Sequence, residues 1–358
     1  MHLELVVPAL FAAQDLPPAS LPALELLLAR GRRTTGQAGD LELWLGRAFG
    51  LNALRAESFS IPAGALTALA HGVDPGTHQW LRADPVHLRA DRDRLLLVPS
   101  QAFAVSAEEA RALADALAPL LSGKFTLHPL APDQWCVRVE DENEFNNWNG
   151  IAADARPPIE LAGADIDPHL PPKPWHPLLT EIQMALYAHP VNTARERRGD
   201  PVINSLWLWG AGKLPAAASG PWQSLVANDA VAIGLARSAG IRHRAPGAGA
   251  AQWLGRAPED GRHLLVLDDL RGVHALGDLD ALARRLQALE EKWFAPLLAA
   301  LKAGRIGMAT LHVPEAAASF EAVRGDLHRF WRRPRPLATY RITPALQDHA
   351  SVMEKARA

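Results

Sequence analysis

The sequence predicts an α/β protein in which a mainly parallel sheet is flanked by helices and a small α+β domain is inserted into the chain. Two observations support this class. Segments with the two-residue period of strands alternate with segments that have the period of helices, a pattern typical of parallel sheets with both faces covered. In addition, 48% of the 358 residues are hydrophobic, which is enough for a sizeable core.

The main sheet begins with the apolar run LELVVPA at residues 3–9, which we expect to be the first buried strand. Further strands are predicted at 203–209, 263–269 and 306–313, and helices at 22–30, 41–49, 177–188, 227–238 and 279–302. Ligands of such sheets bind at the carboxyl ends of the strands. We therefore expect the strand ends at WLWGAG, VLDDLRG and TLHVPE to meet at one cleft.

The predicted insertion is a unit of two strands, a helix and two strands. WLRADPVHL and RLLLVP are strands joined by the charged turn 89–93, and FTLHPL and QWCVRVE are the second pair. The helix between them is capped by Ser106, ahead of Glu108 and Glu109. The predicted domains are a core of residues 1–76 and 144–345, an insertion of residues 77–143 and a tail of residues 346–358.

The composition predicts a cytoplasmic protein that binds neither nucleic acid nor a membrane. The net charge is −2, and the single cysteine, Cys136, cannot form an internal disulfide. The chain has no apolar signal segment and no apolar run of membrane-spanning length. HRFWRRPRP at 328–336 is an exception to the balanced charge, and it is open whether it binds an anion or packs over the core.

The segment WLWGAGKLP is typical of a strand that ends at glycines. Gly210 and Gly212 permit a sharp turn with exposed N–H groups, beside which Lys213 would lie next to an anion. A plain chain reversal explains the same glycines, so the motif alone leaves both interpretations open.

Several motifs occur in an order that resembles the archaeal type of cofactor-independent phosphoglycerate mutases, in the alkaline phosphatase superfamily. They are LPALELLLARG, IPAGALTALAHGVDP, DIDPH, HPVNTARERRGD with WLWGAGKLP, and VANDAVAIGLARSAGI. The resemblance implies an alkaline phosphatase-like fold and an isomerase-like protein. It also implies a phosphorylated serine or threonine nucleophile beside two metal ions, with Mn²⁺, Mg²⁺ or Zn²⁺ required if the chain is active.

The chain departs from that family at the nucleophile. The positions that match the family's serine are Ala63 or Gly64, and neither has a hydroxyl that attacks phosphorus. Ser58 and Ser60 lie just upstream and would be a displaced nucleophile.

The resemblance also implies losses among the metal ligands. Pro8, Ala9 and Leu10 stand at the turn where the family has a metal-binding Asp-Gly pair, and Arg271 lies near the position of a family acid. The remaining candidate ligands are acids and histidines near the matching motifs, namely Asp165, Asp167, His169, Asp268, His274, Asp278 and His312. We therefore predict a pseudoenzyme that requires no cofactor.

Substrate recognition is the part of the family site that the sequence retains best. The candidate ligand-binding residues are Asn192, Arg195, Arg198, Gly210, Gly212 and Lys213. Arginine suits this role because its planar fork binds a carboxylate or phosphate with two hydrogen bonds. A solvated helix end capped by Gly199 explains the arginines equally well. Arg82, Asp84 and His87 lie near the place of a further family motif.

Three functions remain open from the sequence. The first is a non-catalytic, phosphoglycerate-mutase-like regulatory protein that binds a small phosphorylated or carboxylate metabolite, or a protein partner. The second is an active mutase or phosphohydrolase with rearranged metal ligands. The third is a protein-interaction scaffold whose tail binds a partner.

Overall fold

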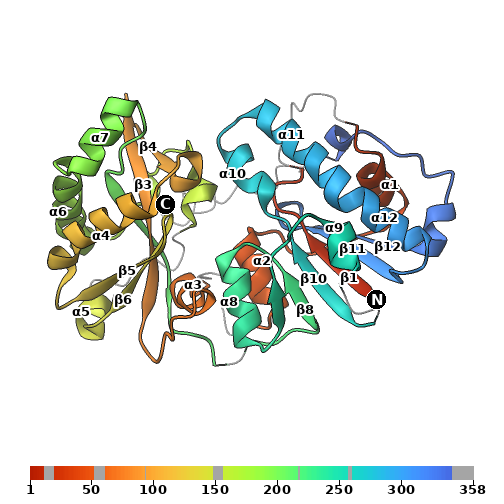
Figure 1. Cartoon of the computed structure of the whole chain (residues 1–358), viewed down its shortest axis with the longest axis horizontal. Coiled ribbons are helices and arrows are strands. Elements are labelled where there is room, and N and C mark those ends of the chain that lie inside the picture. The colour runs from red at the N-terminus through yellow and green to blue at the C-terminus, as the bar shows by residue number, and fades with distance from the viewer. Residues whose placement is uncertain are drawn as a thin grey trace, which may run out of the picture.

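The computed structural model of the chain describes residues 1–11, 20–51, 61–92, 94–147, 156–216, 218–256 and 260–340. These residues form two sheets, each with its own helices, that lie side by side (Figure 1). None of the helices in this described part is long and apolar enough to cross a membrane.

The first sheet, as far as the chain is described, has seven strands in the order β2-β12-β11-β1-β10-β8-β9. The strands from β11 to β9 run parallel, whereas β12 and β2 are antiparallel at one edge. Their bounds are β1 (His2–Val6), β2 (Arg32–Thr35), β8 (Ser224–Val226), β9 (Arg242–Arg244), β10 (Arg262–Val266), β11 (Met308–Val313) and β12 (Ala318–Val323). The predicted mainly parallel sheet is confirmed.

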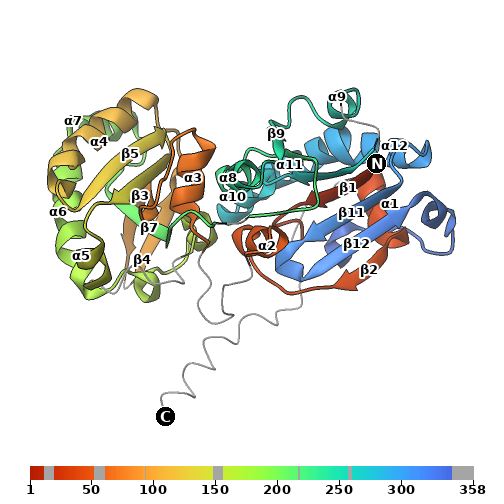
Figure 2. The same ribbon diagram turned by 90° about the horizontal axis from the view of Figure 1, so that it is seen from below.

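Helices cover both faces of this sheet (Figure 2). They are α1 (Pro22–Arg30), α2 (Leu41–Ala48), α8 (Ala230–Ser238), α9 (Ala250–Leu254), α10 (Asp269–Ala275), α11 (Leu279–Leu289) and α12 (Ala295–Lys302). Alternate strand residues point to opposite faces. Leu5 and Leu265 join the apolar cluster that includes α1, α11 and α12, whereas Val6 and Val266 join the cluster that includes α2 and α8. Burial on both faces explains why these strands are continuous apolar runs.

The second sheet is antiparallel throughout its described pairings. Its strands are β3 (Trp80–Asp91), β4 (Arg94–Pro99), β5 (Phe125–Ala131), β6 (Gln134–Val139) and β7 (Ser205–Gly212). The helices of this part are α4 (Ala107–Leu121), α5 (Glu142–Asn147), α6 (His176–Tyr187) and α7 (Pro190–Arg198). The predicted cap of α4 is confirmed, because the Ser106 hydroxyl and the Glu109 carboxylate accept hydrogen bonds from each other's backbone N–H.

Short 3₁₀ turns connect these elements. They lie at Ser100–Ala102, Pro158–Leu161, Asp167–His169, Lys173–Trp175, Pro314–Ala316, Arg324–His328 and Leu337–Thr339. A π-helical turn at Glu290–Phe294 divides the single helix predicted at 279–302 into α11 and α12.

The prediction that three strand ends meet at one edge of a parallel sheet is wrong for strand β7. It pairs antiparallel with β3, so it belongs to the second sheet although it lies far outside residues 77–143. Leu206 and Leu208 pack with α4 and α6, whereas Trp207 and Trp209 join the cluster of the first sheet. An apolar run buried on both faces does not reveal which sheet it joins.

Helix α3 (Ala63–Ala70) lies between the two sheets and contacts α8, β3 and β7 (Figure 1). Glycines permit these close approaches. A Cβ added to Gly64 would lie 2.5 Å from the Leu81 backbone, and one added to Gly234 would lie 2.1 Å from the carbonyl oxygen of Leu66. Backbone atoms cannot yield as a flexible side chain can, so these positions require glycine.

We expect Gly234→Ala to lower the free energy of unfolding by about 1–3 kcal/mol, because the added methyl group forces α3 and α8 apart. The control is Gly325→Ala, since a Cβ at Gly325 meets nothing within 4 Å. Urea denaturation of both variants measures the difference. Equal stability of the two variants would contradict the close helix contact.

Candidate functional site

A cleft of about 260 Å³ lies where the carboxyl ends of β8 and β10 face the second sheet. Its lining comes from both sides: α2, the segments after β8 and β10, strands β3 and β7, and nearby loops. The lining residues used below are Glu42, Arg82, Asp84, Asp133, Trp209, Asp229, Asp268 and Arg271. We call this site the central cleft. It lies at the edge of the parallel sheet where ligands of α/β proteins bind.

The buried guanidinium of Arg271 connects two carboxylates at this edge. It donates to Glu42 Oε1 and Oε2 at 3.0 and 2.8 Å, and to Glu160 Oε1 at 2.7 and 3.2 Å. Burial lowers the pKa of Arg271, but the charges of Glu42 and Glu160 outweigh burial and hold that pKa well above its ordinary value. The three residues join α10, α2 and the Pro158–Leu161 turn through fixed ionic contacts. We call this group the Arg271 clamp.

A second buried ion pair lies on the β3 side of the cleft. Arg82 donates to Asp84 Oδ1 through Nε at 2.9 Å and to the Thr67 hydroxyl at 3.1 Å. The indole Nε1 of Trp209 donates to Asp84 Oδ2 at 2.7 Å, and the Arg82 guanidinium lies 5.3 Å from the Trp209 ring centre. Both oxygens of Asp84 are therefore hydrogen-bonded, as a buried carboxylate requires.

The remaining acids of the cleft are less well compensated. Asp229 caps α8 by accepting from the Ala232 N–H at 2.8 Å. Burial, and next the negative charge of Asp229, raise the pKa of Asp268 to about 7. The lining holds the acids Glu42, Asp84, Asp133, Asp229 and Asp268 against the arginines Arg82 and Arg271. Since both arginines already bind carboxylates, Asp229 and Asp268 give the cleft its negative potential.

Glu315 occupies the neighbouring strand ends of β1 and β11. Its Oε1 accepts from the Ala9 N–H at 3.1 Å, and burial raises the pKa of Glu315 to about 7. Ala9 has a φ of 60°, a strained conformation for a residue with a Cβ. Ala9 stands where the resemblance implies a metal-ligating turn, and its backbone N–H is instead bound by the Glu315 side chain from the Pro314–Ala316 turn after β11.

Neither position predicted for the nucleophile offers a hydroxyl or open space. Ala63 is fully buried, and a Cβ on Gly210 would lie only 2.5 Å from its methyl group. Gly64 lies against the Leu81 backbone. Ser58 and Ser60, the alternative nucleophiles, lie outside the described residues.

The structure does not bring the predicted metal ligands together. Asp165, Asp167 and His169 lie at and beside the Asp167–His169 turn, where the Asp165 carboxylate accepts from the Asp167 N–H at 3.2 Å. Asp165 also bridges Leu96 of β4. These residues are therefore on the second sheet, whereas Asp268 follows β10 of the first.

The other candidates have separate local roles. Asp278 caps α11 by accepting from the Ala281 N–H at 2.8 Å, and His274 lies half-buried in the last turn of α10. His312 on β11 bonds the Ser319 hydroxyl at 2.8 Å, and its ring centre lies 5.0 Å from that of Trp44. In the described ranges, no three His, Cys, Asp or Glu side chains form a group that could hold a metal ion.

The donor set therefore does not fit a two-metal centre. Such a centre needs several carboxylates and imidazoles that converge on two cations. At the strand ends, two of the available carboxylates bind Arg271 instead.

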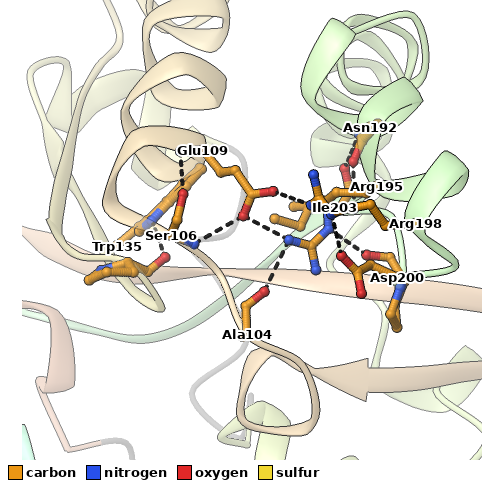
Figure 3. A network of polar contacts seen from close by, with 11 residues as sticks. Ala104, Ser106, Glu109, Trp135, Asn192, Arg195, Arg198, Asp200 and Ile203 are labelled. Carbon is orange, nitrogen blue, oxygen red and sulfur yellow. Dashed lines mark hydrogen bonds and ion pairs between the residues drawn. The ribbon is translucent and has the colours of Figure 1, made fainter.

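Figure 3 shows the predicted ligand-binding residues of α7, which bind other parts of the protein. Arg195 donates to Glu109 Oε2 at 2.9 Å and to the carbonyl oxygens of Ala104 and Pro201. Arg198 donates to Glu109 and Asp200, each at 2.8 Å. Their contacts fasten α7 to α4, and neither side chain lines the central cleft.

The other predicted ligand-binding residues also have protein partners. The Asn192 amide donates to the carbonyl oxygens of Leu186 and Ile203 and accepts from the Ile203 N–H (Figure 3). Lys213 pairs with Glu142 at 2.8 Å.

The glycines of the same motif serve packing. Gly210 has a φ of 61°, and a Cβ on Gly212 would lie 2.7 Å from Pro62. These glycines let β7 approach the start of α3.

The sequence analysis missed Glu42 and Glu160 and placed Arg271 only near a family acid. Glu42 occupies a buried position of the otherwise apolar side of α2. An acid on the apolar side of a predicted helix is a signal that a buried cation faces it. The pattern does not say which cation.

We expect Arg271→Met to lower the free energy of unfolding by about 3–5 kcal/mol, because Glu42 and Glu160 then remain buried without a cation. Arg284→Met, at an exposed arginine of α11, is the matched control and should change stability by less than about 0.5 kcal/mol. Addition of Glu42→Gln to Arg271→Met should restore part of the loss. Urea denaturation followed by circular dichroism measures all three. An equal free energy of unfolding for Arg271→Met and the control would contradict a stabilising role of the Arg271 clamp.

Comparisons with known proteins support a distant relationship. No known family model matches the chain. A segment of 116 residues, 31% of this chain, is 28% identical to the 2,3-bisphosphoglycerate-independent phosphoglycerate mutase of Methanosarcina barkeri (strain Fusaro / DSM 804). That segment spans only 28% of the length of the relative.

Two solved structures are similar over most of the chain. The PH0037 protein from Pyrococcus horikoshii matches with a TM-score of 0.54 and 15% identity, over 90% of this chain and 87% of that one. The cofactor-independent phosphoglycerate mutase from Thermoplasma acidophilum DSM 1728 gives a TM-score of 0.45 and 16% identity, over 100% of this chain and 99% of that one. The chain thus shares the fold of the PH0037 protein and has a weak sequence similarity to part of a cofactor-independent phosphoglycerate mutase.

Proposed function

We propose that this chain is a phosphoglycerate-mutase-like protein that has lost metal-dependent phosphoryl transfer and acts as a regulatory protein by binding a small molecule in the central cleft. The observation that carries the proposal is the Arg271 clamp, which places a side-chain cation between carboxylates at the edge of the sheet where strand-end ligands are expected. The weak similarity to a mutase supports the relationship but not its activity.

The chemistry of the site supports the loss of catalysis at two independent points. A metal-dependent mutase of the resembling type needs a hydroxyl nucleophile, and the matching positions are Ala63 and Gly64. It also needs two cations that bind both the attacking and the leaving oxygen. The Arg271 guanidinium has one positive charge, and its donors already bind Glu42 and Glu160.

The charge of the cleft favours a ligand that carries a positive group. Asp229 and Asp268 line the same cleft, where burial, and next the charge of Asp229, raise the pKa of Asp268. A phosphate or carboxylate ligand, as the sequence suggests, would add negative charge to this lining and be repelled. An amine or guanidine would offset it and would make charge-assisted hydrogen bonds.

The position of the cleft suits regulation. Residues from both sheets line it, with Asp229 and Asp268 on one side and Asp84 and Trp209 on the other. A ligand that contacts both sides would stabilise one arrangement of the two sheets over others, which is how a small molecule shifts a conformational equilibrium.

We expect the purified protein to show no phosphoglycerate mutase and no phosphatase turnover when Mn²⁺, Mg²⁺ or Zn²⁺ is added, because the hydroxyl nucleophile and the two-metal centre are both missing. The assay should include an active cofactor-independent mutase as a positive control. Turnover that a chelator abolishes would contradict the loss of phosphoryl transfer and would point to a displaced nucleophile.

We expect small amines such as agmatine and putrescine to bind more tightly at about pH 8 than at about pH 6. Burial and the charge of Asp229 raise the pKa of Asp268 to about 7, and burial raises the pKa of Glu42, in the same lining, to about 8, so both carboxyl groups lose protons across this interval. Asp268→Asn should reduce this pH dependence, whereas Asp280→Asn, at an exposed residue of α11, should leave it unchanged. Isothermal titration calorimetry, with 3-phosphoglycerate as the anionic comparison, measures the affinities. Tighter binding of 3-phosphoglycerate than of either amine would overturn the proposed ligand class.

A further inference from the structure

A second and larger hollow, of about 810 Å³, lies at the antiparallel edge of the first sheet. The end of α1, strands β2 and β12 and the segment 331–340 form its walls. Among the described residues, the lining includes five arginines and no acidic residue: Arg32, Arg33, Arg332, Arg333 and Arg335. We call this site the arginine groove. Its charge is opposite to that of the central cleft.

The arginines of the groove differ in how they are held. Arg32 pairs with Glu321 at 2.7 Å, and Arg332 donates to the carbonyl oxygen of Gly31 at 3.1 Å. Arg333 and Arg335 are exposed and have no ion-pair partner in the described part of the chain. Their guanidinium groups therefore remain available to an anion. The five arginines of the groove outnumber the one acid that pairs with them, Glu321, and so raise the local positive potential, which attracts polyanions.

Aromatic side chains line the same groove. Phe11 and Tyr340 stack with ring centres 5.8 Å apart, and the Arg33 guanidinium lies 5.9 Å from the Phe320 ring centre. Trp331 is 65% exposed and touches Phe330 edge to face. Much of the Trp331 indole is thus exposed to solvent, although contact of this large apolar ring with water is unfavourable. Such a ring is suited to stack on a planar ligand.

We propose that the arginine groove binds a nucleoside polyphosphate, with the phosphates on Arg333, Arg335 and Arg33 and the base against Trp331. Arginine forks bind phosphate oxygens with paired hydrogen bonds, and aromatic rings stack on bases. The volume of about 810 Å³ lies within the range of small-molecule sites. The net charge of the chain is −2, and the five arginines of the groove form a local cluster and not a long basic stripe. Both features favour a free nucleotide over a nucleic-acid strand.

The site is independent of the proposed function of the central cleft. The groove is built on the β12–β2 edge, whereas the cleft lies after β8 and β10. No described residue belongs to both linings.

The test is a calorimetric titration of the full chain with ATP, ADP, AMP, tripolyphosphate and adenosine. We expect saturable binding of ATP that weakens as phosphates are removed and as salt is added. The double variant Arg333→Gln with Arg335→Gln should weaken ATP binding by about tenfold or more, because it removes charge-assisted hydrogen bonds. Trp331→Ala should weaken ATP binding but leave tripolyphosphate binding unchanged, since only the base contacts the indole.

The matched control is the double variant Arg111→Gln with Arg197→Gln, which removes two exposed arginines from α4 and α7 on the second sheet. It should bind ATP like the wild type. The proposal is overturned if ATP shows no saturable binding, if the control weakens binding as much as the groove variant, or if Trp331→Ala has no effect. Binding of an oligoadenylate that ATP cannot displace would also overturn it and would assign the groove to a strand.

Discussion

The Arg271 clamp is the interaction on which the carboxyl edge of the first sheet depends. Burial of a guanidinium and two carboxylates is costly, and it is tolerated only when each charge is paired and hydrogen-bonded. Arg271 meets this condition because its guanidinium donates hydrogen bonds to Glu42 and Glu160. The clamp thereby fixes α2 and the Pro158–Leu161 turn against α10, and these elements carry much of the wall of the central cleft. Asp229 and Asp268 lie beside a positive charge that is already engaged, so their own charges remain available to a ligand.

The second constraint is the close packing of α3 between the sheets. Gly234 lets α8 approach the backbone of α3, and Gly210 lets β7 approach Ala63. The small residues at 63 and 64 allow the same elements to meet. The position that presents a nucleophile in the resembling family is therefore filled by the junction between the sheets.

Much of the fold follows from the sequence because the parallel strands are buried on both faces. β1 and β10 are largely apolar runs, which are typical of buried strands, and the apolar period of α8 marks its buried side. β2 is different: its RRTT sequence is exposed, and only pairing with β12 makes it a strand. β7 belongs to the second sheet through its antiparallel pairing with β3, which no local pattern contains. The candidate site was harder to predict, because Glu42, Glu160 and Arg271 are 118 and 111 residues apart along the chain and only the fold brings them together.

We propose that Arg271, paired with Glu42 and Glu160 at the strand ends, supplies the positive charge that metal ions would supply in a cofactor-independent mutase. The most direct measurement is the metal content of the full chain, produced in medium supplemented with Mn²⁺ and Zn²⁺, dialysed, and analysed by mass spectrometry beside an active cofactor-independent mutase. We expect the mutase to retain stoichiometric metal and this protein to retain only traces. Stoichiometric metal retained by this protein, and released by a chelator, would contradict it.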